Sequence, residues 1–226
     1  MPENLPGPYP TLYLLHGRSD DDHTWLLNTS IYRYAGGKNL AIFMPQVHLS
    51  YYTDMAEGGN YWTFISQEFP EKMQRLFNLS KKREETFVAG LSMGGYGAMK
   101  LASSFPERFV AAASFSGALD ALKLWQNDPY RDIDFSRIFG SKEALAGSDN
   151  DLVTLFEKLS QSELQPQLLI TCGTEDFLYE INHGFYEQFK EKLPITYVEE
   201  PGDHEWGYWD QQIQRFFHWI ENNYQL

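Results

Sequence analysis

The chain is poor in cysteine, and this limits the sites that it can build. Its 226 residues include one cysteine, Cys172. A single cysteine can form neither an internal disulfide nor a multi-cysteine metal site. The neighbours of Cys172 in "QLLITCG" are apolar. We therefore expect a buried structural thiol.

Basic residues are also scarce. The chain has 18 Lys and Arg against 31 Asp and Glu, which gives a formal net charge of -13. This charge repels nucleic acids and anionic membrane surfaces, and no Lys/Arg cluster opposes it locally. Nucleic acid and membranes are therefore not expected partners.

Long hydrophobic runs are absent from the sequence as well. Nowhere do eighteen apolar residues follow one another, and "MPENLPGPYP" at the start has neither a basic region nor an apolar stretch of signal length. These features favour a cytoplasmic protein. The sequence leaves open whether the protein is a homo-oligomer.

Short apolar runs alternate with longer amphipathic segments along the chain. This order is typical of parallel strands joined by crossover helices, and continuous apolar strands such as "TLYLL" indicate a sheet covered on both faces. We predict one α/β domain over residues 1–226, with a doubly wound, mostly parallel sheet. The expected strands are Thr11–Leu15, Leu40–Met44, Thr86–Gly90, Val110–Phe115, Leu168–Cys172 and Ile195–Glu199.

Two helices and one unusual segment stand between these strands. Helices are predicted over Gly95–Phe105, ended by Pro106, and over Tyr208–Tyr224, where apolar residues recur at helical spacing. Residues 117–160 are long and polar, with "NDPYRDIDF" and "AGSDND" as breaks. We interpret this segment as a lid-like insertion over the strand ends.

The stretch "VAGLSMGGYGAMK" carries the strongest chemical signal. It places Ser92 between Gly90 and Gly94, after an apolar strand and before a helix. In the G-x-S-x-G pattern a sharp strand-to-helix turn exposes the serine, and small flanking residues let strand and helix approach. Ser92 is therefore a candidate nucleophile. The alternative is an inert serine in a glycine-rich turn.

A serine hydroxyl needs a histidine base, and the base needs a carboxylate that orients it. In such folds the chain order is serine, acid, histidine. Asp176 follows the strand in "QLLITCGTED", and His204 lies in the turn "PGDHEW" before the last helix. We predict that these two residues serve Ser92. Glu175 is the rival acid, and His204 could instead only cap the helix.

Backbone amides are the expected oxyanion donors. Met93 opens the helix after the serine, so its N–H points toward the space above Ser92. The second donor is predicted in "LLHGR", where His16 and Gly17 shape the loop and the Arg18 N–H donates. Gly17 or Ser19 could replace Arg18.

Five motifs in order give the chain a resemblance to a known family. They are "YLLHG", "YTDMAEGGNYWTFISQEFP", "GLSMGGYGA", "CGTEDFLYE" and "GDHEWGYWD". Over nearly its whole length the chain resembles the α/β-hydrolase superfamily, its esterase D-like group, and within that group the bacterial tributyrin esterases. The resemblance implies a serine carboxylesterase that hydrolyses short-chain acyl or aromatic esters through an acyl-enzyme. It implies no metal and no cofactor.

The resemblance leaves alternatives for activity. Related enzymes include S-formylglutathione hydrolases and acyltransferases, and a non-catalytic binding module on the same fold is a further alternative. Relatives carry two antiparallel strands before "LYLLHG", whereas only about ten residues precede it here. We therefore expect a shortened sheet edge at the N-terminus, either absent or covered by another subunit.

Aromatic residues make up 16% of the chain, more than a minimal core requires. Tyr61 and Trp62 in "GGNYWTF" and Trp206 in "HEWGYW" are predicted to line the substrate pocket. The competing interpretation is that they are ordinary core residues.

Overall fold

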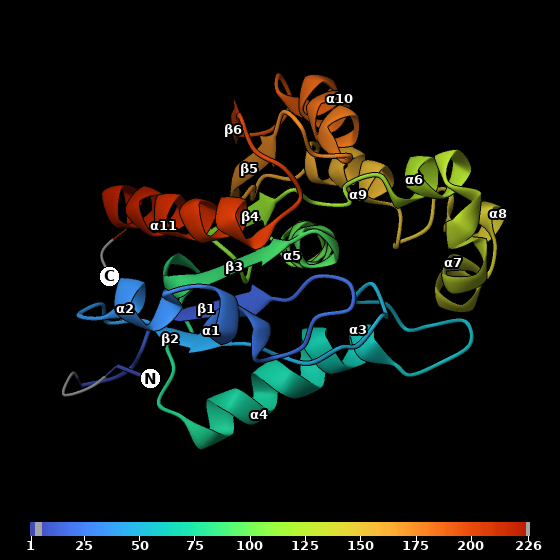
Figure 1. Ribbon diagram of the computed structural model, residues 1–226. Coiled ribbons are helices and arrows are strands. Elements are labelled where there is room, and N and C mark those ends of the chain that lie inside the picture. The colour runs from blue at the N-terminus through green and yellow to red at the C-terminus, as the bar shows by residue number, and fades with distance from the viewer. Residues whose placement is uncertain (3–5, 225–226) are drawn as a thin grey trace.

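The computed structural model describes residues 1–2 and 6–224, and its centre is one six-stranded sheet (Figure 1). The strand order is β2-β1-β3-β4-β5-β6, and every pairing among the described strands is parallel. The strands are β1 (Thr11–Leu15), β2 (Ala41–Phe43), β3 (Thr86–Leu91), β4 (Ala111–Phe115), β5 (Gln167–Gly173) and β6 (Ile195–Glu200). The prediction of a doubly wound α/β sheet is confirmed. Most strand ends lie one residue from their predicted positions, and the others coincide with them.

Alternation along each strand divides the core into two layers. In β1, Leu12 and Leu14 face one hydrophobic cluster, while Tyr13 and Leu15 face the other. All five residues of β1 are buried. A strand buried on both faces has no polar side, which is why its sequence shows no apolar–polar alternation.

Helices cover both faces of the sheet (Figure 1). One layer holds α1 (Thr24–Asn28), α2 (Ile31–Ala35) and α11 (Trp206–Asn223). The other holds α3 (Tyr61–Thr63), the π-helix η1 (Phe64–Glu68), α4 (Phe69–Leu76), α5 (Met93–Ser104) and α10 (Tyr179–Phe189). The 3-10 turn η2 (Arg83–Glu85) leads into β3. The two predicted helices correspond to α5 and α11.

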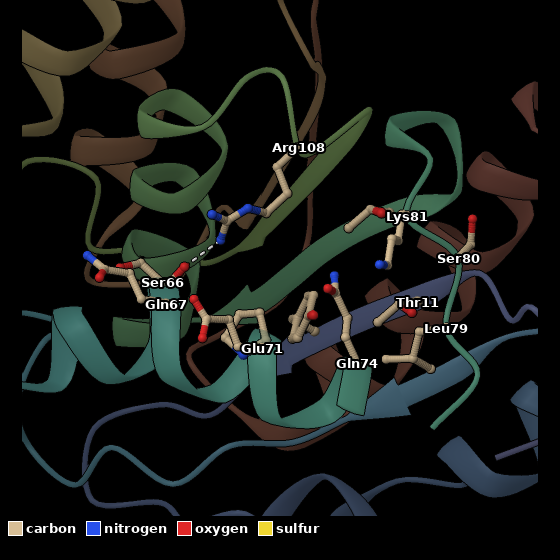
Figure 2. A pocket seen from close by; sticks show the side chains of 12 residues that line it. Thr11, Ser66, Gln67, Glu71, Gln74, Leu79, Ser80, Lys81 and Arg108 are labelled. Atoms are coloured by element: carbon tan, nitrogen blue, oxygen red, sulfur yellow. Dashed lines mark hydrogen bonds between the residues drawn. The ribbon is translucent and has the colours of Figure 1, made fainter. Parts of the chain in front are cut away.

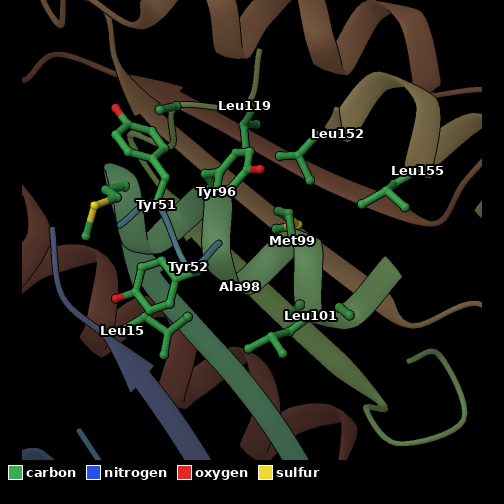
Figure 3. Close-up of a cluster of buried hydrophobic side chains, with 14 of the residues drawn as sticks. Leu15, Tyr51, Tyr52, Tyr96, Ala98, Met99, Leu101, Leu119, Leu152 and Leu155 are labelled. Carbon is green, nitrogen blue, oxygen red and sulfur yellow. The ribbon is translucent and has the colours of Figure 1, made fainter. Parts of the chain in front are cut away.

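Helix α5 is the most deeply buried helix, and eleven of its residues are buried. Figure 3 shows Met99 and Leu101 of α5 among Leu152 and Leu155 on one side and Leu15 on the other. Lys100 is also buried on this helix, with 1% of its surface exposed. Its ammonium group contacts the Tyr52 carbonyl oxygen at 3.1 Å and Asn150 Oδ1 at 2.6 Å. These bonds tie α5 to two loops near the carboxyl ends of the strands.

Residues 117–160 form a series of short helices beside α5 (Figure 1). They are α6 (Ala121–Asn127), η3 (Pro129–Arg131), α7 (Asp132–Phe139), α8 (Lys142–Leu145) and α9 (Leu152–Leu159). Each polar break contains one cap: Asp128 of "NDPYRDIDF" accepts the Tyr130 N–H and caps η3, and Asp151 of "AGSDND" accepts the Val153 N–H and caps α9. Outside these breaks, Asp120 and Ser141 cap α6 and α8. A lid role for the segment remains a prediction.

Strand β2 forms the N-terminal edge of the sheet in the described part of the chain, in accord with the expected shortened edge.

The sole cysteine is fully buried on β5, and burial raises the pKa of its thiol. Among the described residues, no helix combines the length and the apolar character needed to cross a membrane.

Candidate active site

Ser92 occupies the sharp turn between β3 and α5. Its backbone has φ 51° and ψ -116°, a conformation that residues with a side chain rarely adopt. The turn is held in place because the Ser92 N–H donates to the Phe115 carbonyl oxygen at 2.9 Å and its carbonyl accepts from the Tyr96 N–H at 3.1 Å. Strain of this kind is maintained by the surrounding structure and is frequent at functional sites.

Two glycines make this turn possible. A Cβ atom on Gly90 would lie 2.3 Å from the carbonyl oxygen of Gly94, and one on Gly94 would lie 2.5 Å from that of Leu15. Both neighbours are backbone atoms that cannot move aside. The spacing G-x-S-x-G therefore follows from the close approach of β1, β3 and α5.

The structure brings the three predicted side chains together in one row. His204 Nε2 lies 3.0 Å from Ser92 Oγ. On the other side of the ring, His204 Nδ1 lies 2.8 Å from Asp176 Oδ2 and 3.1 Å from Oδ1. Because a carboxylate only accepts, Nδ1 carries the proton and Nε2 is free to accept the serine proton. This is the arrangement that activates a serine.

Asp176 is placed by the turn that follows β5. Its carboxylate is buried, and Oδ1 also accepts the Leu178 N–H at 2.8 Å. The rival Glu175 points elsewhere, because its carboxylate accepts the Gly202 N–H at 2.6 Å and the Thr174 hydroxyl at 2.9 Å. These bonds lower the pKa of Glu175. Asp176 is therefore the carboxylate that contacts the imidazole.

His204 lies in the loop between β6 and α11. Its ring packs edge-on against Trp209, with centroids 4.9 Å apart and planes at 90°. The His204 side chain does not cap α11, because the N-cap residue of this helix is Glu205 and no side-chain cap hydrogen bond is formed there. The interpretation of His204 as only a helix cap is therefore not supported.

His16 is a structural histidine of the neighbouring loop. It is buried, its Nε2 accepts the Val47 N–H at 3.1 Å, and its Nδ1 lies 2.8 Å from the Gly17 carbonyl oxygen. Burial lowers its pKa, which favours the neutral ring that these bonds require. His16 thus shapes the loop after β1, as the sequence predicts.

The predicted oxyanion donors lie at the ends of β1 and β3. The Gly17 N–H is already bonded to Asp20 Oδ2 at 3.1 Å, which removes Gly17 from the alternatives. Among the described residues, no acceptor takes the backbone N–H of Arg18 or of Met93. Both amides are therefore available to a ligand. The Arg18 side chain forms an ion pair with Asp134 of α7.

A cavity of about 460 Å³ opens over Ser92 and His204. Its wall is mixed, with apolar and aromatic side chains interrupted by a few charged ones. The residues that line it are Gly17, Arg18, Asp20, Tyr51, Leu91, Ser92, Ala118, Leu124, Arg131, Phe177, Leu178, His204, Glu205, Trp206 and Trp209. A concave site that combines apolar and aromatic walls with convergent polar groups suits a small organic ligand.

The aromatic predictions divide into two outcomes. Trp206 lines this cavity, whereas Tyr61 and Trp62 do not. Trp62 stacks on Phe105 at 5.8 Å, and the ammonium of Lys100 lies 4.1 Å from its ring centre. The face of an indole ring attracts a cation, so this contact helps to hold Trp62 against α5. The structure therefore places Tyr61 and Trp62 outside the pocket that they were predicted to line. Asp54 braces their segment through the Thr63 N–H at 2.9 Å.

A second cavity of about 190 Å³ lies at the opposite end of the strands, between α4 and the segment before β3. Figure 2 shows Glu71 and Gln74 of α4 facing it, with Lys81 and Arg108 on the other side. Thr11 and Thr86, the first residues of β1 and β3, lie in its wall. It is therefore remote from the turn that carries Ser92.

Metal binding has one geometric possibility among the described residues. Asp21, Asp22 and His23 could each offer a ligand atom, and these atoms lie within 4.8 Å of one another. His23 is exposed and the two carboxylates are partly exposed. Acidic groups at a surface are common without an ion, so the group does not define a metal site. The expectation of no metal and no cofactor stays a prediction.

The sequence did not reveal Tyr52, which supports the loop after β1. Its side chain is fully buried, and its hydroxyl donates to the His16 carbonyl oxygen at 2.9 Å. Its own carbonyl accepts from Lys100. Because His16 lies two residues before Arg18, the Tyr52 hydroxyl holds the loop that presents the Arg18 amide.

We expect Tyr52→Phe to lower kcat for a short p-nitrophenyl ester roughly 3- to 10-fold with little change in KM. The substitution removes one hydrogen bond to the loop and keeps the ring that packs on α5. Steady-state kinetics measure the effect.

Tyr34→Phe is the matched control, since the Tyr34 hydroxyl donates to Asp210 Oδ2 at 2.8 Å, between α2 and α11. We expect its kcat to stay within about 2-fold of the unaltered protein. Equal losses in both variants would mean that the Tyr52 hydroxyl acts on general stability and not on the loop.

Comparison with known proteins gives the family of this chain. Residues 2–220 match the family model Esterase, described as "Putative esterase". The chain therefore belongs to the Esterase family of α/β-hydrolase-type enzymes, in agreement with the resemblance seen in the motifs.

Three relatives specify the class further. An acetyl esterase of Caldicellulosiruptor saccharolyticus is 34% identical over 219 residues, which cover 93% of this chain and 82% of the relative. The fluorophosphonate-binding serine hydrolase FphF of Staphylococcus aureus is 37% identical with a TM-score of 0.88, covering 96% of this chain and 86% of that one. The S-formylglutathione hydrolase FrmB of the same organism is 36% identical with a TM-score of 0.85, covering 97% and 90%. The chain is accordingly a serine hydrolase of the carboxylic ester class.

Proposed function

We propose that the protein hydrolyses short-chain acyl esters through an acyl-enzyme on Ser92. In the first half-reaction Ser92 Oγ attacks the ester carbonyl while His204 Nε2 takes its proton. His204 then gives that proton to the leaving alcohol oxygen as the C–O bond breaks. In the second half-reaction His204 deprotonates a water molecule, the water attacks the acyl carbonyl, and the proton returns to Ser92 as the acid leaves.

The single observation that carries this proposal is the row from Ser92 Oγ through His204 to Asp176, with contacts of 3.0 and 2.8 Å. The amides of Arg18 and Met93 supply the oxyanion contacts. Because they are fixed before the substrate arrives, they stabilise the negative charge without reorganisation.

The short acyl group is supported by likeness to an acetyl esterase. A second candidate is thioester hydrolysis, favoured by the S-formylglutathione hydrolase relative. Both reactions use the same serine, and acyl transfer to another acceptor does so as well. A non-catalytic binding role has no use for an aligned serine, histidine and carboxylate.

A series of p-nitrophenyl esters from acetate to octanoate tests the acyl part of the proposal. We expect the highest kcat/KM between two and four carbons and a loss of about 10-fold or more at eight carbons, because a pocket shaped for a short acyl group, as in the related acetyl esterase, rejects the longer chain. A maximum at octanoate would contradict the short-chain assignment. S-formylglutathione and added alcohol acceptors, followed by product analysis, separate the thioesterase and transferase alternatives.

A further inference from the structure

Phe177 is an exposed aromatic side chain beside the candidate base. It is 60% exposed, compared with 37% for Phe77, the other exposed phenylalanine among the described residues. A phenyl ring has no polar atom, so an exposed ring loses the favourable free energy that its burial would contribute to folding. Its position next to His204 calls for a functional explanation.

The turn after β5 directs this ring outward. Asp176 and Leu178 on either side are buried, with 4% and 1% exposure. The turn is closed by the Asp176 N–H to the Gly173 carbonyl oxygen at 3.2 Å and by the Tyr179 N–H to the Asp176 carbonyl oxygen at 2.9 Å. While Asp176 reaches the imidazole, residue 177 must therefore face the cavity mouth. A polar residue could occupy this position at lower cost in solvent.

The ring continues an aromatic wall. Phe177 lies 4.5 Å from the His204 ring, with the planes at 54°. Trp206 lines the same cavity and is fixed edge-on by Trp25 at 5.3 Å and by Trp209 at 5.2 Å. Phe177 and Trp206 are thus two aromatic side chains held on the His204 side of the cavity.

The reaction itself places the leaving group on this side. His204 must come within hydrogen-bond distance of the departing alcohol oxygen in order to protonate it. The rest of the alcohol then extends from that point along the part of the cavity next to His204. Phe177 and Trp206 form this part of the wall.

We propose that Phe177 forms a subsite for a leaving alcohol with a ring face, either an aromatic ring or a sugar ring. This inference rests on the proposed function and adds the class of alcohol to it. Aromatic rings pack face to edge or offset on such a side chain, and the apolar C–H face of a pyranose ring packs on it in a similar way. A linear alcohol gains much less contact with Phe177.

Acetate esters that share one acyl group test the subsite. Benzyl acetate offers an aromatic alcohol, a monoacetylated methyl pyranoside offers a sugar, and ethyl acetate has no ring. All three give the same acetyl-enzyme, so differences in kcat/KM come from binding and acylation, the steps in which the alcohol is still part of the substrate. For Phe177→Ala we expect kcat/KM to fall about 3- to 10-fold on at least one ring ester, and less than about 2-fold on ethyl acetate.

Three further variants keep the test specific. Phe177→Tyr retains a ring and should retain the preference, whereas Phe177→Leu retains apolar bulk and should lose it. Tyr32→Ala, at an aromatic on α2 that is 75% exposed, should affect all three esters equally. A fall on benzyl acetate alone identifies an aromatic alcohol, and a fall on the pyranoside alone identifies a sugar.

Equal changes on all three esters, or no change on any, would overturn the subsite. Failure of the proposed function is a different result, in which the unaltered protein hydrolyses none of the esters.

Discussion

Replacing Ser92 with alanine is expected to reduce kcat/KM for p-nitrophenyl acetate by at least about 10³- to 10⁴-fold. No acyl-enzyme can form without the hydroxyl, and the residual rate then comes from the oxyanion amides and from binding. KM should change little, because alanine removes only the atom that reacts. Alanine leaves the turn occupied by a small side chain, so the fold should persist.

Ser116→Ala is the matched control for this experiment. Ser116 is also buried, also has a positive φ of 49°, and follows the neighbouring strand β4. We expect it to retain activity within a few-fold, and His48→Ala and His218→Ala should do the same. Comparable activity in Ser92→Ala and the unaltered protein would refute the assignment of the nucleophile.

Changing Asp176 to asparagine should have the second largest effect, a loss of about 10³- to 10⁴-fold in kcat. Asp176 Oδ1 accepts the Leu178 N–H, so an asparagine would keep its carbonyl oxygen at that place. Its NH2 group would then occupy the position of Oδ2 and donate to His204 Nδ1. This moves the imidazole proton to Nε2, and the ring can no longer accept a proton from Ser92.

The measurement pairs steady-state kinetics with the rate at which a fluorophosphonate labels Ser92, and both should fall together. Glu175→Gln is the control, since the Glu175 carboxylate contacts the Gly202 turn and not the imidazole. We expect it to retain kcat within about 3-fold. If Glu175→Gln were the more damaging change, the acid would be misassigned.

Most of the fold could be predicted from sequence because β1, β3, β4 and β5 are buried on both faces. Runs such as "TLYLL" and "QLLIT" are short and apolar and alternate with longer amphipathic segments, which favours buried strands. The G-x-S-x-G pattern is required by the close backbone contacts of Gly90 and Gly94. Chain order then identifies Ser92, Asp176 and His204 as the candidate nucleophile, acid and base. Each of these features can be recognised from a short motif and its place after a strand.

The rest depends on contacts between distant residues. Trp62 was predicted at the pocket, but the buried Lys100, 38 positions later in the chain, holds it elsewhere. Tyr52 supports the loop after β1 because its hydroxyl donates a hydrogen bond to the carbonyl oxygen of His16, 36 positions earlier in the chain. The exposure of Phe177 could not be predicted for another reason. A phenylalanine in "TEDFLYE" is expected to be a core residue, and only the structure shows that its side chain is 60% exposed.

Covalent labelling shows directly whether Ser92 is an activated nucleophile. The folded protein is treated with a fluorophosphonate, its intact mass is measured, and the modified peptide is sequenced by mass spectrometry. We predict one adduct per chain, located on Ser92, with none on Ser92→Ala and much slower labelling of Asp176→Asn. An unlabelled Ser92 in folded protein, or an adduct on another residue, would contradict this prediction.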